Sequence, residues 1–348
     1  VEFWMDGACG DPETRPVYDI QRWWDKLEEL NPDIVYQQNY GAPLRWVGNE
    51  SGYASNTSWQ TIDGQRLWDD YFVRGIEDSN YLHNGEPYIP GAENADDLVW
   101  SVPEVDVRIR SGWFYHANEE PKTPEELVQI YFDSVGRGSP LLLNVAPNPE
   151  GLIDQKDIDS LMGFHDILEN TFDVNYAEGA SAEATQMRGN HPDYAAENVT
   201  DNDYDTYWTM DDGQTTGSVT VELDEPTLMD VIEIQEYIPL GQRISSFTVD
   251  VRVNGEWMSY GEGGTIGYKR LVKGAPITAD AVRVNITGAY AVPLINNVSV
   301  YKADSRIEEE TVQVPGRIMA AEFQEKSGAV FAENKGPNGG SNIGGIQN

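Results

Sequence analysis

The feature that most constrains the fold of this chain is a change in hydrophobic pattern near residue 175. Before it, short apolar runs alternate with segments whose apolar residues recur every three or four positions. After it, apolar and polar residues alternate within short runs that are separated by Gly, Asn and Asp. The first pattern is typical of βαβ units in a parallel sheet, and the second of antiparallel strands in a sandwich. The chain is therefore predicted to combine an α/β part with an all-β part.

Residues 1–175 are predicted to form about four βαβ units, which is half of a (β/α)8-type barrel. Buried strands are expected at Val1–Met5, Asp33–Gln37, Asp97–Val102 and Leu141–Val145. Helices are expected over Val17–Leu30, from Thr123 to Gly136 and over Asp154–Asn170. Thr123 is the expected N-cap of the second helix, because a proline and two acids follow it directly.

Residues 176–303 are predicted to form an antiparallel β-sandwich. Its alternating runs are SVTVEL (218–223), DVIEIQEY (230–237), FTVDVRV (247–253), AVRVNI (281–286) and NVSVY (297–301). Residues 304–314 are charged and are expected to be a linker. Residues 315–348 are expected to be the truncated start of a second module, so we read the chain as a fragment of a longer protein.

The strong acidic excess of the chain excludes several kinds of partner. There are 59 Asp and Glu against 23 Lys and Arg, which gives a formal net charge of −36. The electric field of this negative charge repels phosphate backbones, so we expect no nucleic-acid partner. A neutral sugar is not repelled by it. No apolar run is long enough to predict a membrane span. The single cysteine, Cys9, excludes an internal disulfide and is expected to be a buried thiol.

Several acidic residues lie where the expected strands end. Asp6 follows the strand at Val1–Met5, Glu50 lies in the loop after Arg45, and Glu104 and Asp106 follow the strand at Asp97–Val102. The carboxyl ends of barrel strands meet at one mouth, so these side chains are expected to converge. Aromatic residues that suit the C–H faces of a sugar lie nearby, namely Trp4, Trp46, Trp59, Trp113, Phe114 and Tyr115. Paired carboxylates with aromatic walls favour glycoside hydrolysis. On these residues alone, Asp6 could equally cap a turn and each aromatic ring could belong to the core.

Four motifs in order resemble the second half of an α-L-fucosidase of glycoside hydrolase family 29. They are VEFWMDGACG (1–10), RWVGNESGYAS (45–55), VPEVDVRIRSGWFYH (102–116) and IYFDSVGRGSPLLLNVAPNPEGLI (130–153). The resemblance implies a retaining exo-α-L-fucosidase that releases terminal L-fucose, expected to be 1,3/1,4-linked, from a fucosylated oligosaccharide or glycan. It makes Asp6 the nucleophile and Glu50 the acid/base, with Trp4, Glu104 and Trp113 binding substrate.

The resemblance has one large gap. The family's first strands and their substrate-binding histidines have no counterpart here, and none of the four histidines in the chain is assigned to those roles. We therefore expect the chain on its own to be inactive, although it contains both proposed catalytic acids. No cofactor is expected for the reaction.

The segment ENVTDNDYDTYW (197–208) resembles the entry loop of a discoidin-like, jelly-roll carbohydrate-binding module of family 32. QEYIPLGQRISSF (235–247) and IGYKRL (266–271) match the version of this module that is fused to family 29 fucosidases. The resemblance implies a structural calcium ion on Asp201, Asp203 and Thr206, with Asn297 where related modules often have a glutamate ligand. The alternative is a plain Asx-turn.

Residues 317–331, RIMAAEFQEKSGAVF, resemble the start of a family 6-type carbohydrate-binding module. Together the resemblances imply a bacterial protein that is secreted or periplasmic. Two other functions stay open: a non-catalytic carbohydrate-binding protein with a degenerate barrel, and a related exo-glycosidase of different specificity. The presence of both acids at their motif positions favours the enzyme.

Overall fold

A computed structural model describes residues 2–6, 18–38, 41–69 and 78–307, together with the backbone of residues 330–335 and 341–347. Contacts divide the chain into two units, residues 1–308 and 309–348. In the second unit, strands β15 (Val330–Lys335) and β16 (Ser341–Gln347) pair in antiparallel fashion. Most of the module expected over 315–348 lies outside the described residues, as does Cys9.

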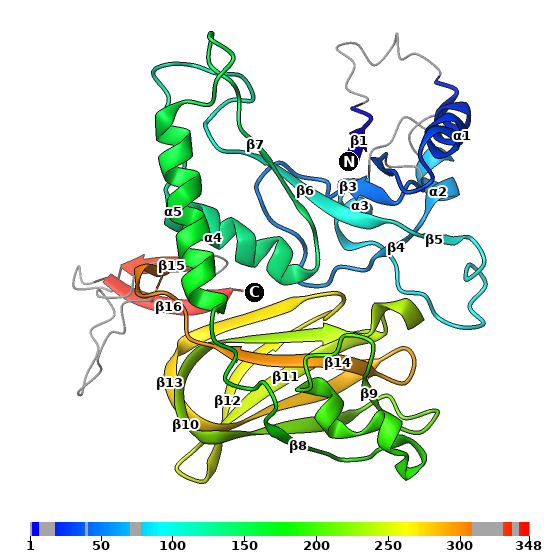
Figure 1. Cartoon of the computed structure of the whole chain (residues 1–348), viewed down its shortest axis with the longest axis vertical. Helices are drawn as coiled ribbons and strands as arrows, with labels where there is room; N and C mark the ends of the chain where they lie inside the picture. Colours follow the sequence, from blue (N-terminus) through cyan, green and yellow to red (C-terminus); the bar gives the residue numbers. More distant parts are fainter. Residues whose placement is uncertain are drawn as a thin grey trace. The chain divides into compact units, whose positions relative to one another are not determined.

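The first unit begins with alternating strands and helices and continues with strands (Figure 1). Its first part contains β1 (Glu2–Trp4), α1 (Ile20–Leu30), β2 (Val35–Gln37), β3 (Leu44–Trp46), β4 (Thr61–Asp63), α2 (Gly64–Trp68), α3 (Ser79–Asn84), β5 (Leu98–Trp100), β6 (Val102–Arg108), α4 (Pro124–Asp133), β7 (Leu141–Asn144) and α5 (Gln155–Phe172). Its second part contains β8 (Ser181–Ala184), β9 (Trp208–Thr209), β10 (Gly217–Glu236), β11 (Ile244–Val253), β12 (Glu256–Gly263), β13 (Arg270–Ala289) and β14 (Leu294–Tyr301). Short 3-10 turns are η3 (Val135–Arg137), η4 (Arg188–Asn190), η5 (Pro192–Tyr194), η6 (Ala196–Val199), η7 (Ile238–Leu240) and η8 (Ser305–Ile307).

The first part is built on a parallel sheet with the strand order β1-β2-β3-β6-β7, which confirms the predicted half-barrel. The pairing aligns Trp4 with Gln37, Gln37 with Leu44 and Leu44 with Val102. The carboxyl ends of these strands therefore lie along one edge of the sheet. Within the described residues, β1 pairs only with β2 and β7 only with β6.

The helices of the first part follow the signals seen in the sequence. Asp19 caps α1 by accepting a hydrogen bond from the Arg22 amide. Thr123 and Glu126 form a reciprocal capping box at the start of α4, as the Thr-Pro-Glu-Glu sequence predicts. The helix ends at Asp133 rather than at Gly136, and the chain continues as the 3-10 turn η3.

A strand forms within the predicted range Asp97–Val102, but the prediction that it is buried in the parallel sheet is wrong. Residues 98–100 form β5, which pairs antiparallel with β4 and leaves Val99 and Trp100 exposed. The neighbouring sequence VPEVDVR forms β6, which is buried along most of its length and lies within the parallel sheet. The sequence analysis missed β6 because the strand contains charged residues. A barrel strand with acids on one face does not show the continuous apolar run of an ordinary parallel strand.

The second part is an antiparallel sheet with the order β12-β11-β13-β10-β14-β9, and β8 also pairs with β10. Strands β10 and β13 are each 20 residues long, and their pairing shifts between Glu222 and Thr227 and again between Met229 and Val231. The first half of β10 pairs with β8 and the second half with β14. Each long strand thus contributes to both layers, as predicted for a sandwich.

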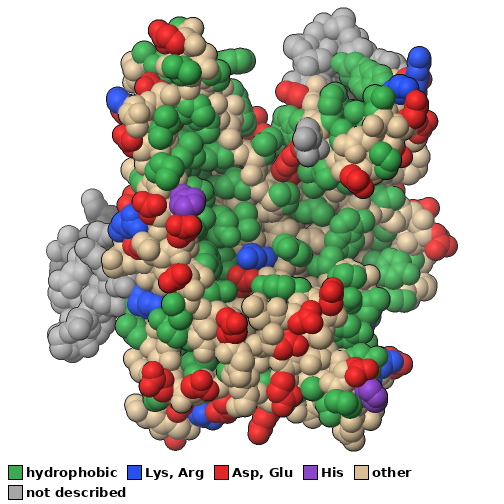
Figure 2. Space-filling view, in the orientation of Figure 1, with side chains coloured by type: hydrophobic (Ala, Val, Ile, Leu, Met, Phe, Trp, Pro, Cys, Tyr) green, Lys and Arg blue, Asp and Glu red, His purple; other side chains and the backbone are tan. Residues whose placement is uncertain are grey.

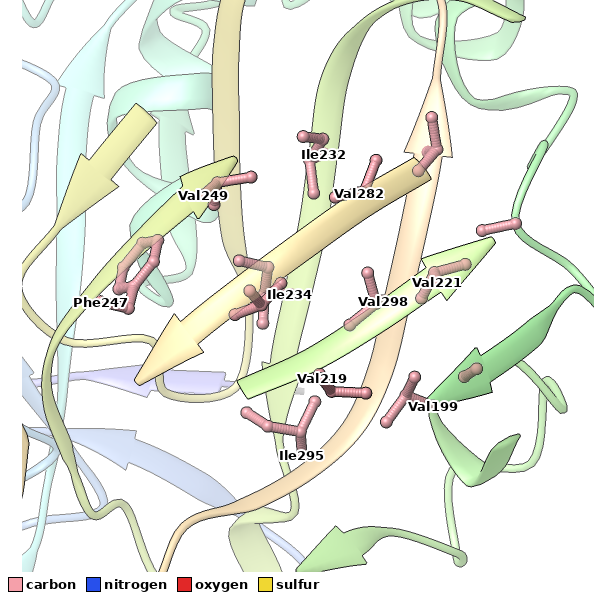
Figure 3. Packing of buried hydrophobic residues seen from close by; sticks show 14 of the residues in the cluster. Val199, Val219, Val221, Ile232, Ile234, Phe247, Val249, Val282, Ile295 and Val298 are labelled. Atoms are coloured by element: carbon pink, nitrogen blue, oxygen red, sulfur yellow. The ribbon is translucent and has the colours of Figure 1, made fainter. Parts of the chain in front are cut away.

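The core of the sandwich is rich in branched apolar side chains, and both halves of β10 contribute to it (Figure 3). Val219 and Val221 come from the first half of β10, and Ile232 and Ile234 from the second. All four are fully buried in one cluster. The alternation of apolar and polar residues in SVTVEL and VIEIQE therefore marks the inward face of each half.

A separate apolar cluster joins the two parts of the first unit. Phe132 of α4 and Ile167 of α5 pack in it with Val231 of β10 and Leu271 of β13. Ala303, just after β14, is buried in the same cluster. We call this group the shared cluster, because both the α/β part and the sandwich contribute side chains to it.

Acidic side chains are spread over the face drawn in Figure 2 rather than gathered in one patch. None of the helices in the described part of the chain combines the length and the apolar composition that a bilayer crossing requires.

Candidate active site

Strand β6 carries two buried carboxyl groups, on Glu104 and Asp106. The two residues are separated by one position, so their side chains leave the strand on the same face. Trp4 of β1 donates its indole N–H to Glu104 Oε2 at 2.8 Å. Trp46 of β3 donates its indole N–H to Asp106 Oδ1 at 2.7 Å. Three parallel strands thus hold two tryptophan–carboxyl pairs on one face of the sheet.

Burial and neighbouring carboxylates perturb both of these acids. Burial, together with the charge and hydrogen bonding of Glu2, raises the pKa of Glu104 to about 8. Burial also raises the pKa of Asp106, and the negative charges of Glu50 and Asp6 raise it further. Clusters of perturbed acids are typical of functional sites.

Asp6 follows strand β1, and its backbone is tied to the sheet through Met5. The Met5 amide donates to the Gln37 carbonyl at 3.2 Å, and the Gln38 side chain donates to the Met5 carbonyl at 3.3 Å. Met5 is buried and Asp6 is exposed. The sheet thus fixes the backbone just before Asp6, and the carboxylate lies at the carboxyl edge of the sheet, as the sequence predicts.

Glu50 lies on the loop of residues 47–60, which follows β3. Its side chain is 49% exposed, and Arg108 Nη1 at the end of β6 donates to its Oε2 at 3.0 Å. The Arg108 guanidinium also lies 5.3 Å from the centre of the Trp113 ring. Arg108 therefore connects the proposed acid/base to one of the tryptophans that the resemblance assigns to substrate binding.

Trp113 lies on a closed loop, residues 109–122, which follows β6. Lys122 N donates to the Ile109 carbonyl at 2.8 Å and closes the loop at its base. Arg110 holds the loop from inside, because its Nη1 donates to the carbonyls of His116 at 3.1 Å and Glu119 at 2.8 Å. Its Nε and Nη2 bind the fully buried carboxylate of Asp157 on α5 at 2.9 and 3.0 Å.

Arg108, Arg110 and Asp157 were not predicted from the sequence to be site residues. A signal for the first was available, since EVDVR alternates charged residues with valine and so places Glu104, Asp106 and Arg108 on one face of a strand. No sequence signal pairs Arg110 with Asp157, because they lie 47 positions apart on different elements.

The loop predicted to bind calcium is compact. Thr206 donates its hydroxyl to Asp201 Oδ2 at 2.7 Å and to the Asp203 carbonyl at 2.9 Å. The Asp203 carboxylate accepts the Asp205 amide at 3.0 Å, which is an Asx-turn contact. Within the described residues, no group of three or more His, Cys, Asp or Glu is arranged to hold a metal ion.

One buried polar atom beside this loop fits an oxygen-preferring cation. Asn296 Oδ1 is buried without a hydrogen-bond partner, while the Nδ2 of the same side chain donates to the Tyr204 carbonyl at 3.2 Å. Asn297, the residue expected from the resemblance, instead accepts from the Ser299 hydroxyl at 3.1 Å. Asn296, rather than Asn297, is therefore the residue of β14 that contacts the loop of residues 201–206.

Comparisons with known proteins agree with this arrangement. Residues 4–170 match the Alpha-L-fucosidase family, and residues 180–298 match the F5/8 type C domain. Alpha-L-fucosidase 1 of Arabidopsis thaliana is 33% identical over 304 residues, which cover 86% of this chain and 58% of the plant protein. The chain spans little more than half the length of the curated relatives it matches, 56% of one and 58% of the other.

Solved structures give the same result. The crystal structure of SpGH29 is similar with a TM-score of 0.78 and 37% identity, covering 87% of this chain and 64% of that one. A Ruminococcus gnavus GH29 fucosidase in complex with fucose has a TM-score of 0.73 and 32% identity, covering 89% and 62%.

The parallel half-barrel with its acidic edge and the sandwich after it define the class of this chain, part of a glycoside-hydrolase barrel with an appended β-sandwich. More closely, residues 4–170 belong to the α-L-fucosidases of glycoside hydrolase family 29, and residues 180–298 form a discoidin-like F5/8 type C domain.

Proposed function

We propose that the protein containing this chain is a retaining exo-α-L-fucosidase that releases terminal, 1,3- or 1,4-linked L-fucose from oligosaccharides or glycoconjugates. The observation that supports the proposal is the arrangement on β6, where two buried carboxyl groups each accept a tryptophan indole N–H and Arg108 on the same strand holds Glu50. It lies at the carboxyl edge of a parallel sheet, where barrel enzymes have their active sites.

In the proposed reaction Asp6 attacks the anomeric carbon of fucose, and the bond from that carbon to the glycosidic oxygen breaks. Glu50 gives its proton to the departing oxygen, which leaves a fucosyl ester on Asp6. Glu50 then takes a proton from water as the water attacks the same carbon, and Asp6 is released. Two inversions give net retention of configuration.

The aromatic residues are proposed to shape the sugar site. Trp4 and Trp113 would form the apolar wall against the fucose ring and its methyl group. Glu104 is 3% exposed, so we assign its contribution to binding through Trp4, whose indole it holds at 2.8 Å. Arg108 would help to place Glu50 against the leaving group.

The test uses the longest natural form of the protein that contains these 348 residues. Asp6→Ala should remove turnover of every fucoside. Glu50→Ala should reduce turnover of natural oligosaccharides far more than turnover of aryl fucosides with good leaving groups, because the latter need little protonation. NMR of the first-formed product should show the α-anomer.

The matched control is Glu93→Ala, which changes an exposed acid that is not among the candidate site residues and should leave both activities unchanged. Equal losses on both substrate classes in Glu50→Ala would contradict the acid/base role. Sugar binding without any turnover would favour the carbohydrate-binding alternative.

We also propose that the loop of residues 201–206 binds a structural calcium ion. Asp201, Asp203 and Thr206 would supply oxygen ligands, and Asn296 Oδ1 is a further oxygen beside the loop. Such donors suit a hard cation. The ion would cross-link the loop to β14 and take no part in the reaction.

A further inference from the structure

The loop that carries Glu50, residues 47–60, is attached to the α/β part at two places. At its start, Val47 N donates to the carbonyl of Glu104 on β6 at 3.0 Å. In its middle, Ala54 N donates to the Asp133 carbonyl at 2.8 Å, and Arg137 Nη1 donates to the Ala54 carbonyl at 2.7 Å. These bonds fix the residues on either side of Glu50.

The final part of the same loop is attached to the sandwich. The Gln242 side chain donates from Nε2 to the Ser58 carbonyl at 2.9 Å and accepts the Gln60 amide on Oε1 at 2.9 Å. Its primary amide therefore pairs with the loop as a neighbouring strand would. Thr265 reinforces the pair, since its hydroxyl accepts the Ser58 amide at 2.9 Å and donates to the Ser58 carbonyl at 3.1 Å.

The surroundings of these bonds exclude water. Gln242 is 7% exposed, Thr265 is 2% exposed and Ser58 is 3% exposed. A Cβ atom at Gly264 would lie 2.2 Å from Thr57 Oγ1 and 2.8 Å from the Asn56 carbonyl, so the two segments approach as closely as glycine permits. Buried hydrogen bonds of this kind are costly to leave unmade, which makes the attachment stiff.

We propose that the sandwich positions the catalytic acid/base loop, with Gln242 and Thr265 as the positioning residues. This inference rests on the proposed role of Glu50. Gln242 and Thr265 would act through the loop backbone, and neither would touch the sugar. The F5/8 type C domain would then be a structural part of the active site as well as an appended module.

The first test is kinetic and uses the longest natural form of the enzyme. Gln242→Glu keeps the size of the side chain but replaces the donor to Ser58 with an oxygen that repels the carbonyl. Misplacement of a catalytic group by about 1 Å can cost on the order of 100-fold. We therefore expect kcat on a natural fucosylated oligosaccharide to fall by about 10- to 100-fold. Aryl fucosides with good leaving groups should lose much less.

Matched variants separate positioning from loss of folding. Gln214→Glu makes the same change at an exposed position of the sandwich and should leave the kinetics unchanged. Thr265→Val removes the hydroxyl and should repeat the selective loss, whereas Thr265→Ser keeps it and should retain activity. An equal loss on both substrate classes, or a lower melting temperature with unchanged selectivity, would overturn the proposal.

The second test needs no activity measurement and uses the same longest natural form of the enzyme. Hydrogen exchange of the amides at residues 47–60 should become faster in Gln242→Glu and stay unchanged in Gln214→Glu. Unchanged exchange in Gln242→Glu would show that the sandwich does not hold the loop. If Glu50→Ala shows no dependence on the leaving group, the proposed function fails, and the exchange result alone then decides whether the sandwich holds the loop.

Discussion

The buried pair of Arg110 and Asp157 offers a sharp test of how the Trp113 loop is held. The Arg110 side chain is 2% exposed and the Asp157 side chain is 0% exposed. The Asp157 carboxylate accepts from Nε at 2.9 Å and from Nη2 at 3.0 Å. In Asp157→Asn one oxygen becomes an NH2 group that faces a guanidinium donor. The arginine charge then stays buried without its closest counter-charge.

Removing one partner of a buried ion pair typically costs about 3–5 kcal/mol. A domain of this size loses roughly 2–4 °C of melting temperature for each kcal/mol. We therefore expect Asp157→Asn to lower the melting temperature by roughly 6–20 °C. The Michaelis constant for fucosides should also rise, because Arg110 holds the carbonyls of the loop that carries Trp113.

The assay is differential scanning calorimetry of the longest natural form, with fucosidase kinetics measured alongside. The matched control is Asp159→Asn on the same helix, where an exposed carboxylate accepts a hydrogen bond from the exposed Gln155 side chain. The control should shift the melting temperature by less than about 2 °C. An equally small shift in Asp157→Asn would refute the reasoning.

Three further predictions concern the acids, a glycine and the cation. Since burial raises the folded-state pKa of Glu104 to about 8, above its ordinary value of 4.5, its stabilising contribution is present below about pH 4.5 and is lost as pH rises toward 8. Glu104→Gln should therefore flatten the dependence of melting temperature on pH across that window, and an unchanged slope would refute this. Gly48→Ala should cost about 2–4 kcal/mol, because φ is +88° and the new Cβ would lie 2.5 Å from the Ser79 carbonyl. Gly151→Ala, with φ +77° and nothing within 4 Å, should cost only the backbone strain, and equal melting temperatures for the two variants would contradict the clash. Calcium should raise the melting temperature and a chelator should lower it, with both effects lost in Asp201→Asn; no response to either reagent would leave only the Asx-turn.

Much of this architecture could be predicted from residue patterns. The change of period near residue 175 separates the parallel sheet from the antiparallel one, and the Thr123 cap marks the start of α4. The patterns failed at β6, where buried acids replaced the apolar residues of an ordinary barrel strand. That failure coincides with the candidate site, because groups placed for chemistry break the local rules that reveal a fold.

The contacts of the site could be predicted only in part. Strand order puts β1 and β6 in one parallel sheet, so the position of Asp6 at the carboxyl edge follows from topology. The pairing of Trp46 with Asp106, or of Gln242 with Ser58, depends on side-chain directions and on how distant segments pack. Gln242 and Ser58 lie 184 positions apart, and no periodicity connects them.

The shared cluster limits how the α/β part and the sandwich can be separated or recombined with other domains. A cut between residues 170 and 180 would leave Phe132 and Ile167 on one piece and Val231 and Leu271 on the other. Each piece would then expose to water a face that is buried in the whole, which favours association and precipitation. A foreign sandwich could replace this one only if it brought a matching apolar face. For that reason, we expect a variant that exchanges one segment alone to be less soluble than the native pair.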